Sequence, residues 1–317
     1  MSKIHVEGNR IFLNNEPIFL RFVLDQGFYP QGIWTAPTDA ALKKDILLAK
    51  KAGFNGARLH QKVFEPRFHY WADKLGYLTW AESSSWGSKK YDPVSARNFL
   101  SQWREVVTRD RNHPSIISWT IFNESGWTYL ERDIDIRNWN LFIKEQHNRF
   151  LTDAVKLTKD LDPTRPINDA SGHVHVMTDL WTVHNYSQDP GKLKADLTPD
   201  ENGVKRDQPE KDCQYEGQPY LVDEYGGIKW AENETRDNAG ESWGYGDNPR
   251  TVEEFYDRLE SLTDVILSFD FISGYTYTQL TDIEQEQNGI YYYDRSKKFD
   301  MKKIRKIFTK VPDRYKK

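Results

Sequence analysis

The sequence predicts an α/β protein folded as a single (β/α)8 TIM barrel. Short apolar runs alternate with segments of helical periodicity, which is typical of repeated βαβ units. Eight such runs occur, and crossover connections make consecutive strands parallel, so they close most simply into a barrel. The length of 317 residues suits a barrel with insertions, and no segment has the composition of a linker. We therefore expect one domain over residues 1–317.

The strands are expected in a regular order along the chain. Residues 1–17 precede the barrel and indicate a short N-terminal hairpin, with Asn14-Asn15 at its turn. Each barrel strand is then a short apolar run bounded by turn residues or by the end of a helix. The expected strands are 18–24, 56–60, 77–82, 116–122, 166–169, 180–184, 220–224 and 274–278.

The helices between these strands carry capping signals. Thr38 is an N-cap for a helix whose apolar residues recur at four- and three-residue spacing until Gly53, which ends it. Asp92-Pro93 opens another helix with a cap and a proline in its first turn. The remaining helices are expected over 68–75, 136–161, 252–267 and 302–309. Long loops are expected over 187–216 and 231–250, on the face formed by the carboxyl ends of the strands.

Composition excludes several classes of partner. Charge is nearly balanced, with 44 basic and 48 acidic residues, and no basic tract is interleaved with aromatics, so we expect no nucleic acid partner. No apolar run is long enough for a membrane span and no signal peptide is evident. The lone Cys213 cannot form an internal disulfide and suits a reducing compartment, which predicts a cytoplasmic protein. The sequence makes no prediction of the oligomeric state.

Two carboxylates follow apolar strands on opposite sides of the expected barrel mouth. Glu124 follows the run 116–122, and Glu224 follows the run 219–222. Barrel enzymes keep their catalytic residues at the carboxyl ends of the strands. A carboxylic acid that holds a proton, facing a carboxylate about 5–5.5 Å away, is what a retaining glycosidase needs. Either residue alone could be a salt-bridged surface group, but the pair at strand ends indicates catalysis.

The two carboxylates should have different roles, one as general acid/base and the other as nucleophile. Their mutual repulsion should raise one of the two pKa values. We assign the proton to Glu124, because Asn123 precedes it and can form a hydrogen bond with the 2-hydroxyl of a sugar. Glu224 would then attack the anomeric carbon, and Glu124 would switch from acid to base in the second step.

Further side chains are candidates for substrate binding. Arg58 and His60 alternate along the second strand and should point into the barrel, Arg58 toward the nucleophile and His60 toward substrate hydroxyls. Both could instead be polar core groups that tie strands together. His184 and Tyr186 bracket the end of the sixth strand, where the Tyr186 hydroxyl can reach the nucleophile and His184 the sugar. The set is completed by Asp25 at the end of the first strand, Tyr277 in the last strand and Trp243 in the loop 231–250.

Three histidines raise the question of a metal site. His173 and His175 alternate, and His184 could converge with them on zinc. No helical His-Glu-x-x-His pattern is present, and a histidine alone more often makes hydrogen bonds. We therefore expect no metal and no cofactor. The charged run 109–114 precedes the fourth strand, which places it on the amino-terminal face in a structural role.

With these residues the chain resembles the catalytic barrel of glycoside hydrolase family 2, which includes β-galactosidases, β-glucuronidases and β-mannosidases. The resemblance runs from about residue 10 to about residue 300. It implies a TIM barrel in which Glu124 is the acid/base, Glu224 is the nucleophile and configuration is retained. The motifs that carry it are Phe54-Asn55-Gly56-Ala57-Arg58, Tyr70-Trp71-Ala72-Asp73-Lys74-Leu75-Gly76, Arg109-Asp110-Arg111-Asn112-His113-Pro114-Ser115-Ile116, Asn123-Glu124-Ser125 and Glu224-Tyr225-Gly226-Gly227.

The chain departs from the pattern of this family in three ways. The family normally carries β-sandwich domains ahead of the barrel, whereas here the barrel pattern begins close to Met1. The end of the eighth strand, 275–282, lacks the Trp expected below the sugar, although a Tyr there could replace it. His173 stands where similar sequences suggest Trp, and the first strand carries the bulky Phe22. These departures are typical of an excised or engineered barrel.

The favoured hypothesis is a retaining β-glycosidase whose partner is a small carbohydrate, a β-linked hexoside. No obvious Asn-x-Lys constellation marks a uronic acid site, which favours a galactoside or another neutral sugar over a glucuronide. One alternative is a repurposed barrel that binds or transforms a non-sugar apolar ligand with a carboxylate base. Another is a carbohydrate-binding protein without catalysis, although the intact carboxylate pair argues against it.

Overall fold

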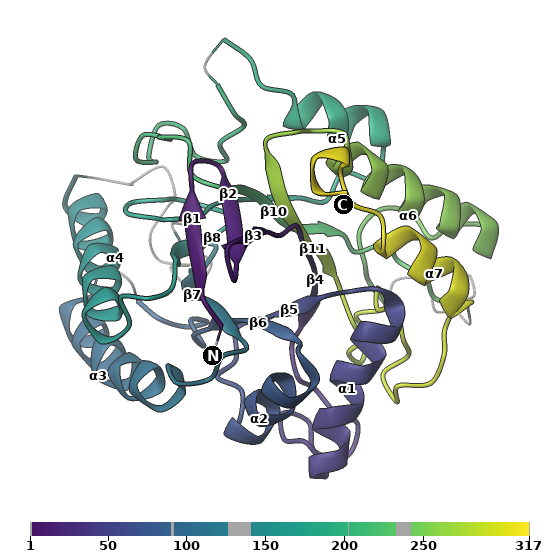
Figure 1. Ribbon diagram of the computed structural model, residues 1–317, viewed down its shortest axis with the longest axis horizontal. Helices are drawn as coiled ribbons and strands as arrows, with labels where there is room; N and C mark the ends of the chain where they lie inside the picture. Colours follow the sequence, from purple (N-terminus) through teal and green to yellow (C-terminus); the bar gives the residue numbers. More distant parts are fainter. Residues whose placement is uncertain (1, 90–91, 126–140, 202, 233–241, 317) are drawn as a thin grey trace.

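Eight parallel strands form a nearly closed barrel with helices around its outside, as predicted (Figure 1). The computed structural model describes residues 2–89, 92–125, 141–201, 203–232 and 242–316. The hydrogen-bonded order is β8-β7-β6-β5-β4-β11-β10-β9, and every neighbouring pair is parallel. The strands are β4 (Leu20–Asp25), β5 (Gly56–Leu59), β6 (Leu78–Glu82), β7 (Ile116–Asn123), β8 (Ile167–Ser171), β9 (Trp181–Asn185), β10 (Tyr220–Gly226) and β11 (Ile272–Thr278).

Side chains join the two ends of this order, β8 and β9. The Thr182 hydroxyl on β9 donates to the carbonyl oxygen of Ala170 at 3.3 Å and accepts from the Gly172 amide at 2.9 Å. The Asn168 side chain adds a further hydrogen bond to Thr182 at 3.3 Å. The seam between β8 and β9 is therefore bridged by a hydroxyl, and the polar groups at the ends of both strands are brought together.

The helices begin and end near the capping residues that the sequence indicated. The Thr38 side chain accepts from the Ala41 amide, and Gly53 ends the first helix in the left-handed conformation with φ 109°. Asp92 caps the helix that starts at Pro93. The helices are α1 (Asp39–Ala52), α2 (Pro66–Leu75), α3 (Pro93–Asp110), α4 (Leu141–Leu161), α5 (Pro190–Leu197), α6 (Val252–Leu267) and α7 (Met301–Phe308), with a short 3-10 turn at Asp313–Tyr315.

The expectation of a long loop over 187–216 is wrong in part, because this segment contains α5. Asp189 caps the helix by accepting from the Lys192 amide, and Pro190 occupies its first position. Leu193 and Leu197, four residues apart, bury one face of the helix. Part of two other expected elements, 136–140 of a helix and 233–241 of a loop, lies outside the described residues.

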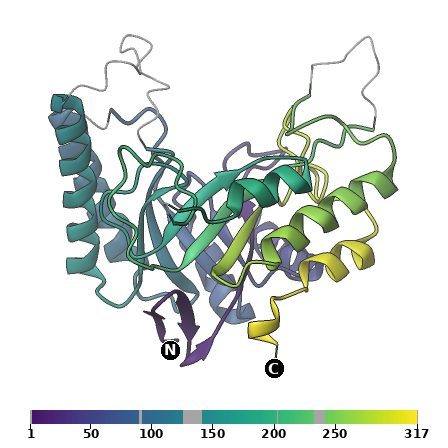
Figure 2. The ribbon, with the colours of Figure 1, turned by 90° about the horizontal axis from the view of Figure 1, so that it is seen from above.

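The expected hairpin at the N-terminus is a three-stranded antiparallel sheet, β1 (Ile4–Glu7), β2 (Arg10–Leu13) and β3 (Glu16–Pro17). The predicted turn at Asn14-Asn15 joins β2 to β3, and both residues have positive φ. The turn between β1 and β2, which contains Gly8, was not predicted. This sheet lies at the amino-terminal end of the barrel (Figure 2), where Ile4 and Ile11 join the apolar cluster inside the strands.

The barrel interior changes character from one end to the other. Near the N-terminal sheet it is filled by large apolar side chains, among them Phe22 and Trp80. Gly56 on β5 makes room for this layer, because an added Cβ would come within 2.2 Å of the Phe22 ring. Toward the carboxyl ends of the strands the interior becomes polar and charged. This polarity gradient places the candidate site at one end of the barrel.

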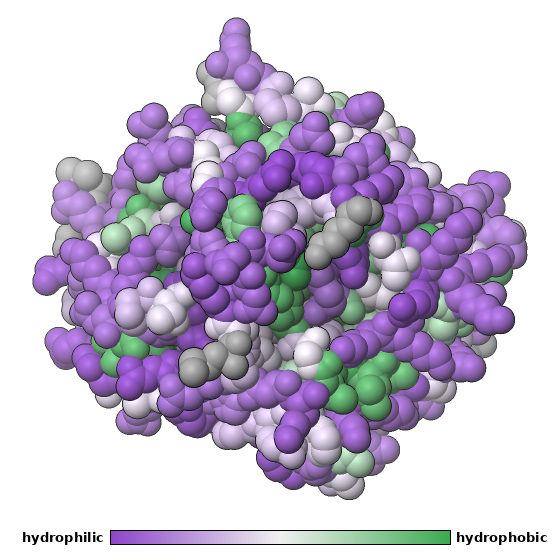
Figure 3. Space-filling view, viewed as in Figure 1, coloured by the Kyte–Doolittle hydropathy of each residue, from purple (hydrophilic) through white to green (hydrophobic). Residues whose placement is uncertain are grey.

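The face of the molecule that carries the N-terminal sheet is predominantly polar (Figure 3). Hydrophilic side chains cover most of the face seen in Figure 3. None of the described helices has the length and apolarity that crossing a membrane requires.

Candidate active site

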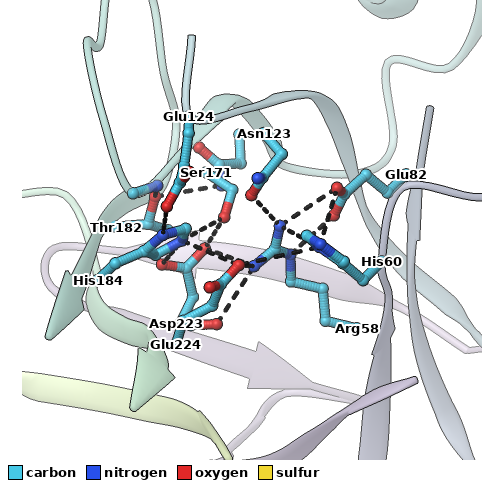
Figure 4. Close-up of polar contacts among 12 residues, drawn as sticks. Arg58, His60, Glu82, Asn123, Glu124, Ser171, Thr182, His184, Asp223 and Glu224 are labelled. Carbon is cyan, nitrogen blue, oxygen red and sulfur yellow. Dashed lines mark hydrogen bonds and ion pairs between the residues drawn. The ribbon is translucent and has the colours of Figure 1, made fainter. Parts of the chain in front are cut away.

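Polar side chains from six neighbouring strands converge at the carboxyl end of the barrel (Figure 4). Such convergence is expected because all eight strands are parallel and end at the same face. Most of these side chains are buried. The residues that meet there are Arg58 from β5, Glu82 from β6, Asn123 and Glu124 at the end of β7, Ser171 from β8, His184 from β9, and Asp223 and Glu224 from β10.

A β-bulge in β10 allows two consecutive carboxylates to face the same centre. Val222 pairs with Val183, but the next pair joins Glu224 to His184, which leaves Asp223 as the extra residue. Side chains normally alternate between the two faces of a strand, and a bulge re-aims them. The Asp223 carboxylate accepts from the Ser171 hydroxyl at 2.5 Å, and Glu224 contacts Arg58.

Arg58 forms an ion pair with Glu224, as the sequence suggested. Its guanidinium is fully buried and donates at 2.7 Å to each of three acceptors, the carboxylates of Glu82 and Glu224 and the amide oxygen of Asn123. Burial acts to raise the pKa of Glu224, but the positive charges of His184 and Arg58 outweigh it and the pKa lies below its usual value. Glu224 is therefore ionised at neutral pH, as a nucleophile requires.

His184 lies between the carboxylates that the sequence singled out. Its Nδ1 is 2.8 Å from Glu124 Oε1, and its Nε2 is 3.3 Å from Glu224 Oε1 and 2.9 Å from the Ser171 hydroxyl. Burial acts to lower the pKa of His184, but the charges of Glu224 and Asp223 and the hydrogen bond to Glu124 raise it to about 9. His184 is therefore an imidazolium at neutral pH.

This imidazolium corrects the expectation that Glu124 carries the proton. Burial acts to raise the pKa of Glu124, but the hydrogen bond and charge of His184 hold it below its usual value. The prediction considered only the repulsion between two carboxylates. A cation between them outweighs that repulsion, so at neutral pH the shared proton is held by His184, whose pKa is raised, and not by Glu124.

The two carboxylates and His184 lie close together. One carboxylate oxygen of Glu124, one of Glu224 and a ring nitrogen of His184 all lie within 4.8 Å of one another. This spacing is near the 5–5.5 Å typical of retaining enzymes and shorter than the 6.5–9.5 Å of inverting ones. The same three groups are also the ligand types that could hold a metal ion, but only after His184 loses its proton.

The histidines considered for zinc have other partners. His175 uses both ring nitrogens, with Nδ1 2.8 Å from Asp169 and Nε2 3.0 Å from the Thr182 carbonyl. His173 Nδ1 lies 2.8 Å from the carbonyl oxygen of Ser125. The structure thus assigns His175 to the seam between β8 and β9, where it supports the strand that carries His184.

Tyr186 and His60 take positions at the rim of the cluster. The Tyr186 hydroxyl donates to Glu224 Oε2 at 2.5 Å, and its ring stacks on Tyr245 with 3.4 Å between centroids. His60 Nδ1 lies 3.1 Å from Arg58 Nη2. Burial and the neighbouring Arg58 lower the pKa of His60 to about 3, so its ring is neutral and can accept as well as donate a hydrogen bond.

Tyr277 does not reach this cluster. It is fully buried and packs against Tyr225 and Phe308 in the layer between strands and helices. Because side chains alternate along a strand, its neighbour Thr278 faces the site instead, and the Thr278 hydroxyl lies 3.0 Å from that of Tyr186.

Asp25 also lies away from the carboxylate pair, whereas Trp243 packs against Tyr245 at the rim. Asp25 accepts from the Gly27 amide at 2.8 Å, and burial and the charge of Asp45 on α1 raise its pKa to about 6. Its side chain belongs with the outer layer. Trp243 is on the catalytic face in the loop after β10, with 45% of its surface exposed.

The sequence reasoning missed several residues of this end of the barrel. Ser171 ends its strand, and that position was a usable signal. Tyr245 and Glu286 lie in irregular loops, where no periodicity indicates which way a side chain points. Glu286 forms hydrogen bonds with Gln26 and Asn288 beside the cluster.

The fold and the site define a (β/α)8-barrel protein with a pair of carboxylates at the carboxyl ends of its strands. Residues 4–312 match the family described as glycosyl hydrolases family 2, TIM barrel domain, and the chain belongs to this family. The resemblance seen in the sequence motifs is thereby confirmed.

Similar proteins include β-galactosidases and uronidases. A β-galactosidase from Photobacterium profundum is 27% identical over 177 residues, which cover 54% of this chain and 15% of that protein. One from Pseudoalteromonas haloplanktis is 25% identical over 204 residues, 62% of this chain and 18% of that protein. The chain thus spans a small part of the length of these relatives.

Solved structures share the fold at lower identity. A family 2 β-galacturonidase from Eisenbergiella tayi has a TM-score of 0.73 at 18% identity, covering 97% of this chain and 54% of that one. A β-glucuronidase from Bacteroides uniformis has a TM-score of 0.75 at 21% identity, covering 94% and 36%.

Proposed function

We propose that this barrel is a retaining β-glycosidase that hydrolyses β-linked hexosides by double displacement. The observation that carries the proposal is the placement of Glu124 and Glu224 across a single imidazolium, with carboxylate oxygens within 4.8 Å. Membership of glycosyl hydrolase family 2 supports the same chemistry.

The first step uses Glu224 as the nucleophile. Its Oε1 is held by Arg58 and its Oε2 by the Tyr186 hydroxyl, which together aim the carboxylate and keep it ionised. Arg58 also donates a hydrogen bond to the amide oxygen of Asn123. This leaves the amide nitrogen of Asn123 available to donate to the sugar 2-hydroxyl. Attack on the anomeric carbon forms a glycosyl ester as the bond to the leaving group breaks.

The proton for the leaving group comes from the pair formed by Glu124 and His184. In the free enzyme the pair holds one proton, which resides on His184. Movement of that proton across the 2.8 Å contact makes Glu124 a carboxylic acid that can protonate the departing oxygen. In the second step Glu124 takes a proton from water, which attacks the ester and releases the sugar with its configuration retained.

A neutral hexoside is the first substrate to test, since the curated relatives above are β-galactosidases. The experiment is hydrolysis of nitrophenyl β-galactoside, β-glucoside, β-mannoside and β-glucuronide by wild type, Glu224→Gln and the control Glu216→Gln. Glu216 is exposed and lies ahead of β10. We expect wild type and control to act alike and Glu224→Gln to be inactive.

A folded wild type that releases no nitrophenol from any sugar would overturn the proposal. That result would favour the alternatives of a repurposed barrel or a carbohydrate-binding protein.

A further inference from the structure

A third carboxylate, Glu286, lies at the catalytic face in the loop that follows β11. Its Oε1 accepts from the Asn288 side chain at 3.2 Å, and its Oε2 is 3.5 Å from Gln26 Nε2. Gln26 directly follows β4, so two separate segments hold the carboxylate. Glu286 has no role in the mechanism above.

Neutral amides fix this carboxylate in place. Gln26 donates to Gln279 Oε1 at 2.9 Å, and Gln279 in turn donates to Asn288 Oδ1 at 2.9 Å. Gln279 and Asn288 are each only 1% exposed, so their geometry is set by packing. We call Gln26, Gln279 and Asn288 the amide cluster. Three linked amides that converge on one half-buried carboxylate indicate a preorganised acceptor.

The amide cluster adjoins the nucleophile. Gln279 follows Thr278, whose hydroxyl lies 3.0 Å from that of Tyr186, and Tyr186 donates to Glu224. A short chain of contacts therefore runs from Glu286 to Glu224 along the end of β11. A sugar bound at Glu224 would lie beside the end of β11, where this chain of contacts begins.

An exposed indole flanks the loop of Glu286. The Trp243 amide donates to the carbonyl oxygen of Gln285 at 2.7 Å, and the Gln287 amide donates to the carbonyl oxygen of Trp243 at 2.8 Å. This pairing holds Glu286 between two anchored residues. The Trp243 ring is an apolar surface of the kind on which sugar rings stack.

The charge beside Glu286 is negative above pH 7. The hydrogen-bond partners of Glu286 are neutral amides, and burial together with the charge of Glu224 raises its pKa to about 7. A second carboxylate placed here by a ligand would meet repulsion from both Glu286 and Glu224, which are partly desolvated by burial. Sugar hydroxyls would instead meet a carboxylate, which accepts hydrogen bonds and is already positioned by Gln26 and Asn288.

We propose that Glu286 is a specificity-determining residue that accepts hydrogen bonds from the hydroxyls of a neutral hexoside and excludes uronic acids. The inference rests on the proposed glycosidase function and names its substrate class. It separates this chain from the β-glucuronidase and β-galacturonidase structures, which share its fold at low identity.

The test compares one neutral and one acidic substrate in three proteins. The rates of hydrolysis of nitrophenyl β-galactoside and β-galacturonide are measured for wild type, Glu286→Gln and the control Glu284→Gln. The control changes an exposed carboxylate of the same loop. We expect wild type to prefer the galactoside. Glu286→Gln should reduce the ratio of kcat/KM for the galactoside to kcat/KM for the galacturonide by roughly ten-fold or more, since a charged group in a partly desolvated site discriminates strongly between neutral and anionic ligands. The control should leave the ratio unchanged.

The preference should also depend on pH, because only the ionised Glu286 repels a uronate. The groups that face it are Gln26 just after β4, Gln279 just after β11, Asn288 from its own loop, Glu224 from β10 and Tyr245 from the loop after β10. The ratio of kcat/KM for the galactoside to kcat/KM for the galacturonide should be larger at pH 8 than at pH 6 in wild type. In Glu286→Gln this ratio should not change with pH. Titration of the catalytic pair cancels in this ratio.

Several outcomes would overturn the inference. They are a wild type that prefers the galacturonide, and a ratio in Glu286→Gln within two-fold of wild type. Failure of the glycosidase proposal is distinguished by ligand-observed NMR of galactose and galacturonate binding to the same proteins. Glu286-dependent preference for galactose without hydrolysis would contradict the proposed reaction and support the inference, whereas equal binding of both sugars would contradict the inference.

Discussion

His184 Nδ1 lies 2.8 Å from Glu124 Oε1, and this contact determines which of the two groups holds their shared proton. His184 is on β9 and Glu124 follows β7, so the contact spans the seam where β8 and β9 end the hydrogen-bonded order. The pKa of His184 is raised to about 9 while that of Glu124 is lowered. The two groups therefore titrate as a pair with one shared proton.

His184→Asn should change the pH dependence of hydrolysis. In wild type the pair keeps its proton up to about pH 9, so we expect kcat/KM to fall only near that pH. In the variant Glu124 titrates alone, and because its own pKa lies well below that of the pair, the fall should move to lower pH. The measurement is a profile of kcat/KM from pH 4 to 10, with His5→Asn in the N-terminal sheet as the control. An unshifted alkaline limb would show that His184 does not share the proton.

The same histidine should make stability depend on pH. Because its folded pKa of about 9 exceeds the unfolded value near 6.5, its contribution is fully present below about pH 6.5 and is lost as the pH rises through 9. The midpoint of thermal unfolding of wild type should therefore fall between pH 6.5 and 9.5 by more than that of His184→Asn. Circular dichroism at a series of pH values measures this, and parallel curves for the two proteins would contradict it.

Arg58→Met should destabilise the protein strongly. Arg58 is fully buried between Glu82 and Glu224, and its loss leaves buried carboxylates without a cation. Removal of one partner of such a pair costs roughly 3–5 kcal/mol of unfolding free energy. Urea unfolding measures the change. The control Arg67→Met breaks an ion pair whose arginine is half exposed, and we expect little change.

If Arg58→Met does not fold, Arg58→Lys tests the same point. It keeps the charge but loses the fork that reaches three acceptors, so it should be less stable than wild type and slower at forming the glycosyl ester. A variant as stable and as active as wild type would show that Arg58 does not hold the nucleophile.

Glu124→Gln should separate the two steps of the reaction. With a dinitrophenyl glycoside the leaving group needs no proton, so the ester on Glu224 should still form but should persist because water lacks its base. Added azide should restore turnover and give a β-glycosyl azide, while Glu224→Gln should not be rescued in this way. Mass spectrometry of the protein and NMR of the product measure both results. Absence of a trapped ester would contradict the assignment of Glu124 as acid/base.

Much of the fold was predictable because its signals are local. Thr38, Gly53 and Asp92 cap their helices as expected, since a cap depends on residues within one turn. Strand ends were predicted within a few residues. The missed helix α5 also had a local signal, Asp189-Pro190, within a segment whose polar composition indicated a loop.

Alternation along strands was a less reliable guide to the site. It placed Arg58 toward Glu224 correctly. Tyr277, a candidate to replace the family's Trp and not a prediction from alternation, faces the helices while Thr278 faces the site. The bulge at Asp223 breaks alternation altogether. A bulge is defined by the pairing of two strands, so no single strand's sequence reveals it.

The sequence by itself determined the barrel, the strand ends that carry Glu124 and Glu224, and the family to which the chain belongs, because these depend on residues close together in the chain. Only the tertiary structure decided which groups surround each carboxylate. Glu124 is 60 residues from His184, and Gln26 is 260 residues from Glu286. A pKa depends on charges and burial within a few ångströms in space, and folding alone creates that neighbourhood.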